Sequence, residues 1–255
     1  MRGNPLRTLE IGRFDALDYP TNEAINTLCT NLFFAGADIK KIMITSCRPQ
    51  EGKSFISMNL MRSLAGLGKK VVLVDADIRA SALVGMYGIR VSKRDMGLSH
   101  YLSGMCVPED ILVYTNMENA YLILSGKNVV NSLPLFNTPK FELLLNLLAE
   151  LFDVVLVDAP PVGTIIDAAQ IARSCDGTLF VIQSNLIGRQ ELSEAIRQIE
   201  KSACPILGTV LNKFNMSQYG TKKYYYSHYS AYAHNSENPL NRTQYVNSGS
   251  GRKGK

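Results

Sequence analysis

The chain has 255 residues, of which 46% are hydrophobic and 19% charged, so it can bury one sizeable core and is not a disordered polyelectrolyte. No apolar run approaches the ~18 residues that a membrane span needs, and residues 1–18 carry charges where a secretory signal would be apolar. The net charge of +5 belongs to residues 216–255, where six basic residues stand against one acidic residue, which argues against a DNA-binding body.

In chain order, the first predicted element is a helix at about Thr21–Phe34, which Thr21 or Asn22 would cap. Short apolar runs that end in small or polar residues predict buried strands at Ile42–Thr45, Val71–Val74, Tyr121–Leu124, Val154–Val157, Thr178–Ile182 and Leu207–Leu211. Helical patterns lie at Ser54–Leu67, Phe141–Leu151, Ile165–Arg173 and Gln190–Ser202, and the weakly periodic stretch Ala80–Asn119 predicts short helices and loops. This alternation predicts an α/β fold: a parallel sheet with helices on both faces and a ligand at the carboxyl ends of the strands.

The sequence pattern divides the chain into three parts: an N-terminal segment (1–37), an α/β domain (38–215) and a tail (216–255). The tail is rich in Tyr, Ser, Asn and Lys and has almost no aliphatic residues, so we expect it to be flexible. The five cysteines are scattered without a CxxC pair, which predicts reduced, mostly buried thiols in a protein that stays in the cytoplasm.

A phosphate loop is predicted where the strand Ile42–Thr45 runs into Gly52-Lys53-Ser54 and a helix. Backbone N–H groups at the helix start would face a β-phosphate, the Lys53 ammonium would neutralise phosphate oxygens, and the Ser54 hydroxyl would bind Mg²⁺. Two features weaken the motif: Cys47 replaces its first glycine, and Gly-Lys-Ser alone also begins ordinary helices. The predicted nucleotide contacts in this loop are Arg48, Pro49, Gln50, Glu51, Gly52, Lys53, Ser54 and Phe55.

Acidic residues end two of the apolar strands, in Val-Asp75-Ala-Asp77-Ile-Arg79 and in Val-Asp158-Ala-Pro-Pro161. A single acidic residue at such a position commonly caps the next turn. Three of them beside a phosphate loop are more specific, because carboxylates hold Mg²⁺ directly or through its waters and can accept a hydroxyl proton. Together with Lys53, these residues predict a site for MgATP.

With these motifs the sequence resembles the bacterial tyrosine kinases of capsule and exopolysaccharide assembly, of the CpsD/CapB type. The matching stretches are the loop Arg48–Ser54, the Asp75-x-Asp77-x-Arg79 and Asp158 motifs, Gly97-Leu-Ser, and Gly208-Thr-Val-Leu-Asn212. The resemblance implies the P-loop fold of the partitioning-type ATPases, ATP and Mg²⁺ as ligands, and transfer of phosphate to tyrosine. It makes residues 38–215 a kinase domain and the first helix an oligomerisation helix.

For the site, the resemblance implies that Lys53, Asp75, Asp77 and Asp158 are catalytic and that Ser54, Asp77 and Asp158 hold the metal. We assign the tyrosine proton to Asp75, although Asp77 is an alternative base. Arg79 joins the nucleotide contacts. Asn212 would read the adenine ring, but asparagine is also a common polar end of a strand.

Seven of the 12 tyrosines lie in the last 40 residues. Such a tail is also compatible with low-complexity binding to nucleic acid or membrane. Beside a kinase site we read it as the substrate, and we expect no nucleic-acid partner. The predicted autophosphorylation sites are Tyr219, Tyr224, Tyr225, Tyr226, Tyr229 and Tyr232, with Tyr245 beyond them.

The implied partners are a membrane-anchored activator of the polysaccharide co-polymerase (chain-length-determinant) type, which would recruit the kinase to the inner face of the membrane, a cognate tyrosine phosphatase, and other copies of the chain. The first helix departs from the family here: Glu23 is kept, but Asn26 and Cys29 replace two arginines that would dock a neighbouring copy. Because neither side chain replaces a guanidinium fork, we expect weaker self-assembly. The phosphate loop also departs from the family: Gln50 stands where the family has glycine, and glutamine would be strained there if the position needs a positive φ. Two rival functions stay open, a partitioning-type ATPase switch and an ATP-binding scaffold of polysaccharide assembly with weakened catalysis.

Overall fold

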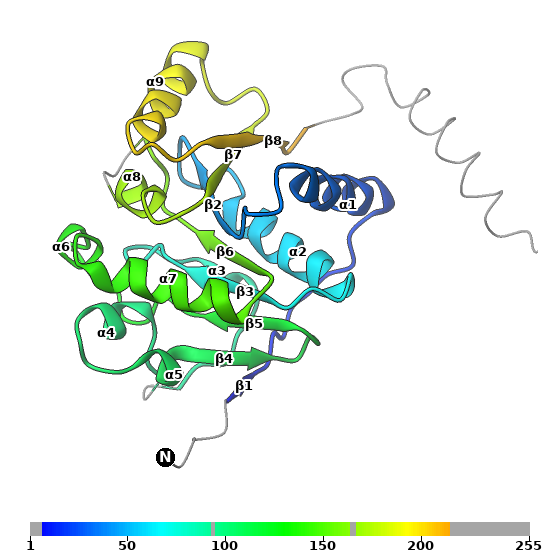
Figure 1. Cartoon of the computed structure of the whole chain (residues 1–255). Coiled ribbons are helices and arrows are strands. Elements are labelled where there is room, and N and C mark those ends of the chain that lie inside the picture. The colour runs from blue at the N-terminus through cyan, green and yellow to red at the C-terminus, as the bar shows by residue number, and fades with distance from the viewer. Residues whose placement is uncertain (1–6, 93–94, 164–166, 215–255) are drawn as a thin grey trace, which may run out of the picture. The chain divides into compact units, whose positions relative to one another are not determined.

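The computed structural model describes residues 7–92, 95–163 and 167–214 (Figure 1). The chain divides into two units, Met1–Lys213 and Phe214–Lys255, and every helix and strand below belongs to the first. Within the described ranges, no helix is both long and apolar enough to cross a bilayer. All five cysteines are free thiols, and all except Cys106 are buried, as the sequence predicts.

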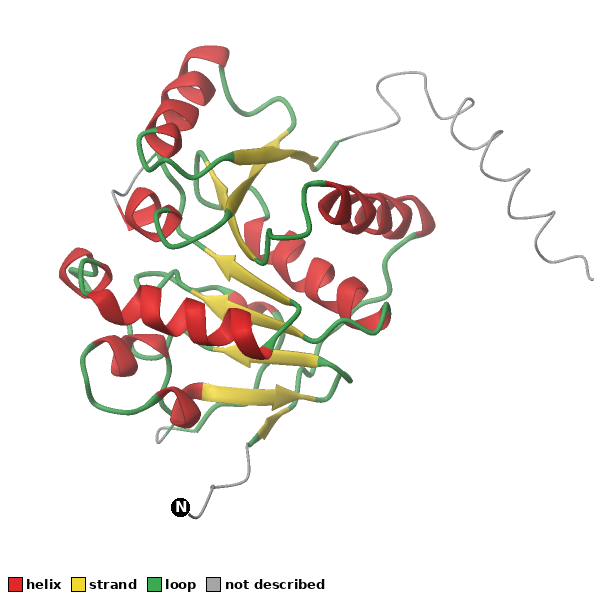
Figure 2. Cartoon of the chain, viewed as in Figure 1, coloured by secondary structure: helices red, strands yellow, loops and turns green. Residues whose placement is uncertain are grey.

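The described residues form one eight-stranded sheet in the order β1-β4-β5-β3-β6-β2-β7-β8 (Figures 1 and 2). Neighbouring strands run parallel except for the pair β4 and β5. The central strands are apolar and buried on both faces, which is typical of parallel sheets covered by helices. In chain order the strands are β1 (Thr8–Leu9), β2 (Lys41–Ser46), β3 (Val71–Asp75), β4 (Leu112–Thr115), β5 (Ala120–Ile123), β6 (Val154–Asp158), β7 (Gly177–Gln183) and β8 (Ile206–Asn212).

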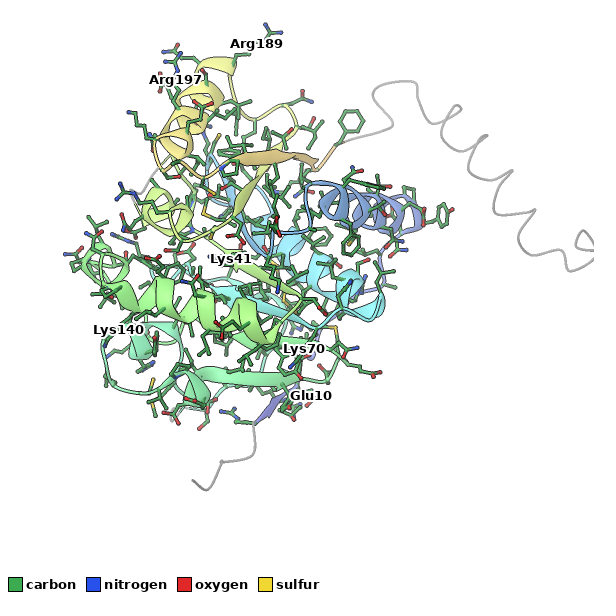
Figure 3. The ribbon with its side chains drawn as sticks, viewed as in Figure 1. Glu10, Lys41, Lys70, Lys140, Arg189 and Arg197 are labelled. Atoms are coloured by element: carbon green, nitrogen blue, oxygen red, sulfur yellow. The ribbon has the colours of Figure 1, made fainter. Side chains whose placement is uncertain are left out.

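Helices cover both faces of the sheet, as predicted. The longer ones are α1 (Tyr19–Phe34), α2 (Lys53–Gly66), α7 (Pro139–Leu151), α8 (Asp167–Ala172) and α9 (Arg189–Glu200). The short ones are α3 (Leu83–Met86), α4 (Leu98–Leu102), α5 (Pro108–Ile111) and α6 (Leu133–Phe136). Helices α1 and α2 pack on one face, and α7, α8 and α9 on the other. Each face of the sheet has its own hydrophobic core, and alternate strand residues belong to opposite cores. Val72 and Val74 pack in the core beneath α7, whereas Val71 and Leu73 pack in the core beneath α2. On α9, Ala195 and Ile199 are buried while Arg189 and Arg197 point outward (Figure 3).

All six strands predicted from the sequence are present, with ends within two residues of the prediction. Two strands are missed. Strand β1 has only two residues, and β4 pairs antiparallel with β5 inside a stretch predicted as helices and loops. The cap of α1 is also corrected: Asp18 rather than Thr21 or Asn22 precedes the helix, and its carboxylate accepts the Thr21 N–H at 3.1 Å. Pro20 in the first turn, a position that tolerates proline, fixes this earlier start.

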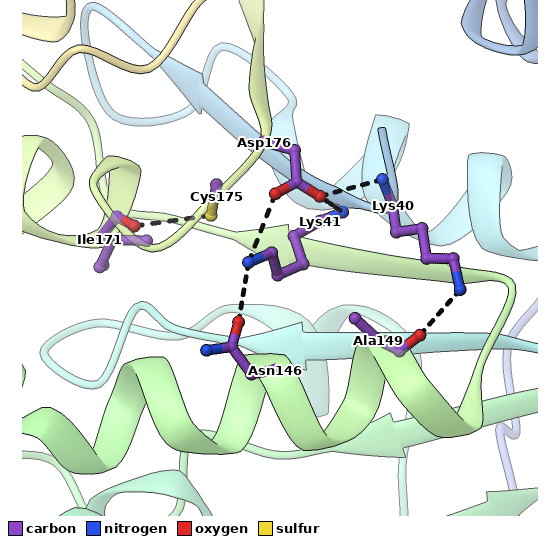
Figure 4. Close-up of polar contacts among 7 residues, drawn as sticks. All are labelled: Lys40, Lys41, Asn146, Ala149, Ile171, Cys175 and Asp176. Carbon is purple, nitrogen blue, oxygen red and sulfur yellow. Dashed lines mark hydrogen bonds and ion pairs between the residues drawn. The ribbon is translucent and has the colours of Figure 1, made fainter. Parts of the chain in front are cut away.

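The amino end of β2 is held by one carboxylate. Asp176 accepts the backbone N–H groups of Lys40 and Lys41 at 3.0 and 2.8 Å, and its other oxygen lies 3.3 Å from the Lys41 ammonium (Figure 4). Both lysine side chains also donate to α7, Lys41 to Asn146 and Lys40 to the Ala149 carbonyl. This network fixes the start of the strand whose far end carries the phosphate loop.

Candidate active site

Two strands with the same sequence, Val-Val-Leu-Val-Asp, place two carboxylates side by side. Strands β3 and β6 pair in parallel register from Val71 and Val154 to Asp75 and Asp158. On the other side of β6, Ile44 of β2 is the partner of Asp158. The carboxyl ends of three central strands therefore bring Asp75, Asp158 and the loop after β2 to one edge of the sheet, where ligands of open α/β sheets bind.

The phosphate loop runs from the end of β2 into α2, as the motif requires. Helix α2 begins at Lys53, and Gly52 before it is left-handed with φ of 98°. A Cβ atom at Gly52 would lie 2.0 Å from the Asn212 amide nitrogen, so any other residue would be strained at this φ and would displace the Asn212 side chain. Lys53 is only 8% exposed. The buried ammonium at the positive end of a 14-residue helix forms a site that favours an anion.

The two departures from the usual loop have different consequences. Cys47 lies outside the left-handed region and is fully buried, and burial raises the pKa of its thiol to about 12, so it acts as a neutral core residue. Gly163 packs so closely against it that an added Cβ would lie 2.5 Å from the Cys47 carbonyl. Gln50 has φ of 63°, a left-handed conformation that costs a residue other than glycine about 1–2 kcal/mol. The expectation of strain at Gln50 is confirmed.

Two charged residues of the loop make contacts within the protein. Glu51 is fully buried, and its carboxylate accepts the N–H groups of Arg48 at 2.8 Å and Gln183 at 3.2 Å. The Arg48 guanidinium forms a two-pronged ion pair with Glu191 of α9, at 2.5 and 2.6 Å. Both side chains therefore stabilise the loop through contacts within the protein. Their predicted contact with nucleotide stays a prediction.

Asp158 is the hydroxyl-binding carboxylate of the site. Its two oxygens accept the hydroxyls of Ser54 at 2.6 Å and Ser57 at 3.2 Å. Burial raises its pKa to about 6, an effect that the nearby Lys53 ammonium and these two hydroxyls oppose. Ser57 was not predicted from the sequence. It lies one helical turn after Ser54 on the same face of α2, and that spacing was the available signal.

Asp75 and Asp77 occupy different environments. Strand β3 ends at Asp75, so Asp77 lies beyond the extended segment. Asp77 is half-exposed and caps a turn by accepting the Ala80 N–H at 3.1 Å. Asp75 is 1% exposed; burial first and the Asp158 charge second raise its pKa to about 7, against hydrogen bonds that include one from Ser81.

The oxygens gathered here fit a hard divalent cation. Buried Asp75 Oδ1 has no hydrogen-bond partner within the described residues, and Ser54 and Asp158 offer a hydroxyl and a carboxylate in direct contact. Across the described ranges, no group of three or more His, Cys, Asp or Glu side chains is placed to hold a metal by itself. That combination suits Mg²⁺, which binds one or two carboxylates and takes its other ligands from phosphates and water.

The last two predicted contacts, Arg79 and Asn212, are both engaged inside the protein. The Arg79 guanidinium binds Asp167 at 2.8 Å, Ser132 at 2.6 Å and the Val130 carbonyl at 2.8 Å. Asn212 donates from its amide nitrogen to the Glu51 carbonyl at 2.8 Å. Only the fold brings these groups together, because they come from segments far apart in the chain.

Comparisons with known proteins agree with this geometry. Residues 39–208 match the family model of the AAA domain. The tyrosine-protein kinase CpsD of Streptococcus agalactiae is 38% identical over 197 residues, which cover 77% of this chain and 84% of that protein. The chain belongs to this family of bacterial tyrosine-protein kinases.

Solved structures show the same likeness in three dimensions. The kinase domain of the Escherichia coli tyrosine kinase ETK superposes with a TM-score of 0.71 at 29% identity, covering 78% of this chain and 81% of that one. The septum site-determining protein MinD of Pyrococcus horikoshii, solved with Mg-ADP, has a TM-score of 0.58 at 25% identity, covering 69% and 71%. The fold is therefore that of the P-loop kinases and partitioning-type ATPases, as the resemblance implied.

In this kinase, the two positions where the family has arginines face the protein's own α2. Asn26 accepts the Ser63 hydroxyl at 2.6 Å, and Cys29 is fully buried. Helix α1 therefore uses these positions to pack within the chain, which is compatible with the weaker self-assembly that we expect. The predicted tyrosine sites from Tyr219 to Tyr245 lie outside the described residues.

Proposed function

We propose that this chain is an ATP-dependent protein-tyrosine kinase that phosphorylates its own C-terminal tyrosines and regulates capsule or exopolysaccharide synthesis. The observation that carries the proposal is the buried pair Asp75 and Asp158 at the ends of twin strands beside the phosphate loop. A raised carboxylate pKa inside a phosphate-binding site is typical of a group that handles protons. Membership in the tyrosine-kinase family supports tyrosine as the acceptor.

The nucleotide phosphates would lie on residues Gln50–Phe55, where N–H groups at the start of α2 and the Lys53 ammonium neutralise their charge. When bound, Mg²⁺ supplies further charge neutralisation, and Ser54, Asp77 and Asp158 are the residues that would hold it. Asn212 would contact adenine through its carboxamide oxygen, since its nitrogen binds Glu51. Arg79 would contact phosphate from its present position beside Asp167, where 30% of its side chain stays exposed.

In the reaction, the tyrosine oxygen forms a bond to the γ-phosphorus of ATP while the bond from that phosphorus to the bridging oxygen breaks. The electron pair leaves with the β-phosphate of ADP, and the phenolic proton passes to Asp75. A pKa of about 7 leaves a large fraction of Asp75 able to accept this proton at neutral pH. Asp77, which is more exposed, is the alternative base.

The tail offers both a substrate and a switch. Two of its six basic residues, Lys222 and Lys223, directly precede the run Tyr224–Tyr226. Each phosphotyrosine adds about −1.5 to −2 charge, so about three modifications would cancel the tail's positive excess. Phosphorylation would thereby change which charged surfaces the tail binds.

The partners proposed for this kinase are a membrane-anchored activator of the co-polymerase type, a cognate tyrosine phosphatase and other copies of the chain. The activator would bring the protein to the inner face of the membrane. The rival reading as a partitioning-type ATPase switch requires a second basic residue reaching the phosphates early in the loop. Arg48 occupies that neighbourhood, but its guanidinium is paired with Glu191, which favours the kinase.

The test is incubation of the full chain with MgATP, with and without the cytoplasmic segment of the activator, followed by mass mapping of residues 219–245. We expect phosphate on several tail tyrosines and more of it with the activator. ATP hydrolysis without any tyrosine labelling would instead support the ATPase switch, and ATP binding without turnover would support the scaffold.

A further inference from the structure

Residues at the carboxyl ends of β7 and β8 form hydrogen bonds that connect the phosphate loop to these strands. The Lys213 ammonium donates to the Gln50 carbonyl at 2.7 Å and to the Gln183 side-chain oxygen at 3.0 Å. Next to it, the Asn212 amide nitrogen donates to the Glu51 carbonyl at 2.8 Å. Two consecutive carbonyls of the loop are thus bound by two consecutive residues at the end of the last strand.

These bonds orient the donors that a phosphate needs. In a planar trans peptide the C=O and N–H point in opposite directions. Fixing the Gln50 and Glu51 carbonyls toward β8 therefore turns the N–H groups of Glu51 and Gly52 away from β8. A run of N–H groups with a common direction is the arrangement that binds phosphate in such loops.

Lys213 binds the loop at its residue with the least favourable backbone conformation. Gln50 adopts φ of 63°, a conformation that glycine reaches freely and glutamine does not. The carbonyl that Lys213 binds is that of Gln50 itself. Lys213 also has a left-handed backbone, with φ of 54°, in the turn that follows β8. Strain at two facing residues that are joined by a charged hydrogen bond is typical of a conformation held for function.

We infer that Lys213 is a positioning residue for nucleotide binding, and that its bond to Gln50 keeps the loop in the phosphate-binding conformation despite the missing glycine. The inference rests on the proposed function only in that nucleotide phosphates bind this loop. The ligand is a nucleoside di- or triphosphate, and Lys213 acts on it through the loop.

The test combines Lys213→Met with Gln50→Gly and measures the Kd for MgADP by titration with a fluorescent ADP analogue. We expect K213M to raise this Kd about tenfold, the range of one charge-assisted hydrogen bond. In the Q50G background the same change should raise it only about twofold, because glycine needs no support at positive φ. K213R should restore most of the affinity in the original background.

Lys40→Met is the matched control. Lys40 also donates its ammonium to a backbone carbonyl, that of Ala149 at 3.0 Å, but at the opposite end of β2 (Figure 4). K40M should bind MgADP as the unmodified chain does. Hydrogen exchange without nucleotide gives a direct readout: in K213M the amides of Glu51 and Gly52 should exchange faster, while those around Lys40 should not change.

Three results would overturn the inference. The first two are an unchanged Kd for MgADP in K213M and an equal loss of affinity in the original and Q50G backgrounds. The third is a loss of affinity in both K213M and K40M that accompanies a lower melting temperature in both. If the unmodified chain does not bind MgADP, the inference and the nucleotide site both fail. If it binds MgADP but labels no tyrosine, only the proposed kinase function fails and the role of Lys213 stands.

Discussion

The charged groups near the two ends of strand β2 lie in different environments. At the amino end, Asp176 has both oxygens occupied by N–H groups and an ammonium. Near the carboxyl end, Asp75 of β3 and Asp158 of β6 are buried side by side with raised pKa values, and Gln50 in the loop after β2 is left-handed. The first arrangement stabilises the folded chain, whereas the second costs stability that a bound nucleotide and cation can recover. Strain and unsatisfied polar groups gathered at one edge are typical of a functional site.

The largest effect should come from Lys53→Met at the carboxyl end. Removing the buried ammonium takes away the charge that balances the transferred phosphoryl group, so tail phosphorylation should fall by about 10²–10³-fold or more. Mass mapping of the tail tyrosines measures the loss, and circular dichroism checks that the fold is intact. Undiminished labelling would refute the assignment of the site.

Asp75→Asn should lower kcat by about 10²–10⁴-fold, because a proton acceptor is lost while the shape of the side chain is kept. Asp77→Asn should act mainly through the Mg²⁺ dependence. The decisive measurement is the pH profile of kcat: the rise with pH near 7 should vanish in D75N and remain in D77N. The opposite pattern would make Asp77 the base.

Asp176→Ala probes the amino end and should reduce stability without touching chemistry. It leaves the N–H groups of Lys40 and Lys41 without their acceptor, a loss of about 2–4 kcal/mol in the free energy of unfolding. Denaturant unfolding measures it. The Kd for MgADP, taken well below the melting temperature, should stay within about twofold of the original. A large change in affinity would contradict the conclusion that the amino end of β2 contributes to stability but not to nucleotide binding.

A further expected effect is a pH dependence of the free energy of unfolding of the chain without metal or nucleotide. The folded-state pKa values of Asp75 and Asp158, about 7 and 6, lie above the ordinary aspartate value of 3.8. The folded state therefore binds more protons in this range, and its stability should fall as pH rises from about 4 to 7. Thermal unfolding in a chelator should show this fall, and D75N should reduce it. MgADP should offset it in the original chain.

The sequence by itself determined the class of fold and predicted where the candidate site lies along the chain. Apolar runs ending in acidic residues identify β3 and β6, and Gly52-Lys53-Ser54 after a strand identifies the phosphate loop, because each signal is local to a few adjacent residues. The left-handed conformation of Gln50 could also be anticipated, since the residue stands where the family has glycine.

Only the tertiary structure decided which distant groups meet. Sequence gives no sign that Glu51 is buried against Gln183, that Arg48 pairs with Glu191, or that Lys213 binds the Gln50 carbonyl. The short strand β4 escaped prediction because its order comes from pairing with β5 rather than from its own four residues. Strand register places Asp75 beside Asp158, and burial there sets their pKa values. Contacts across more than a hundred residues depend on packing, which local patterns do not encode.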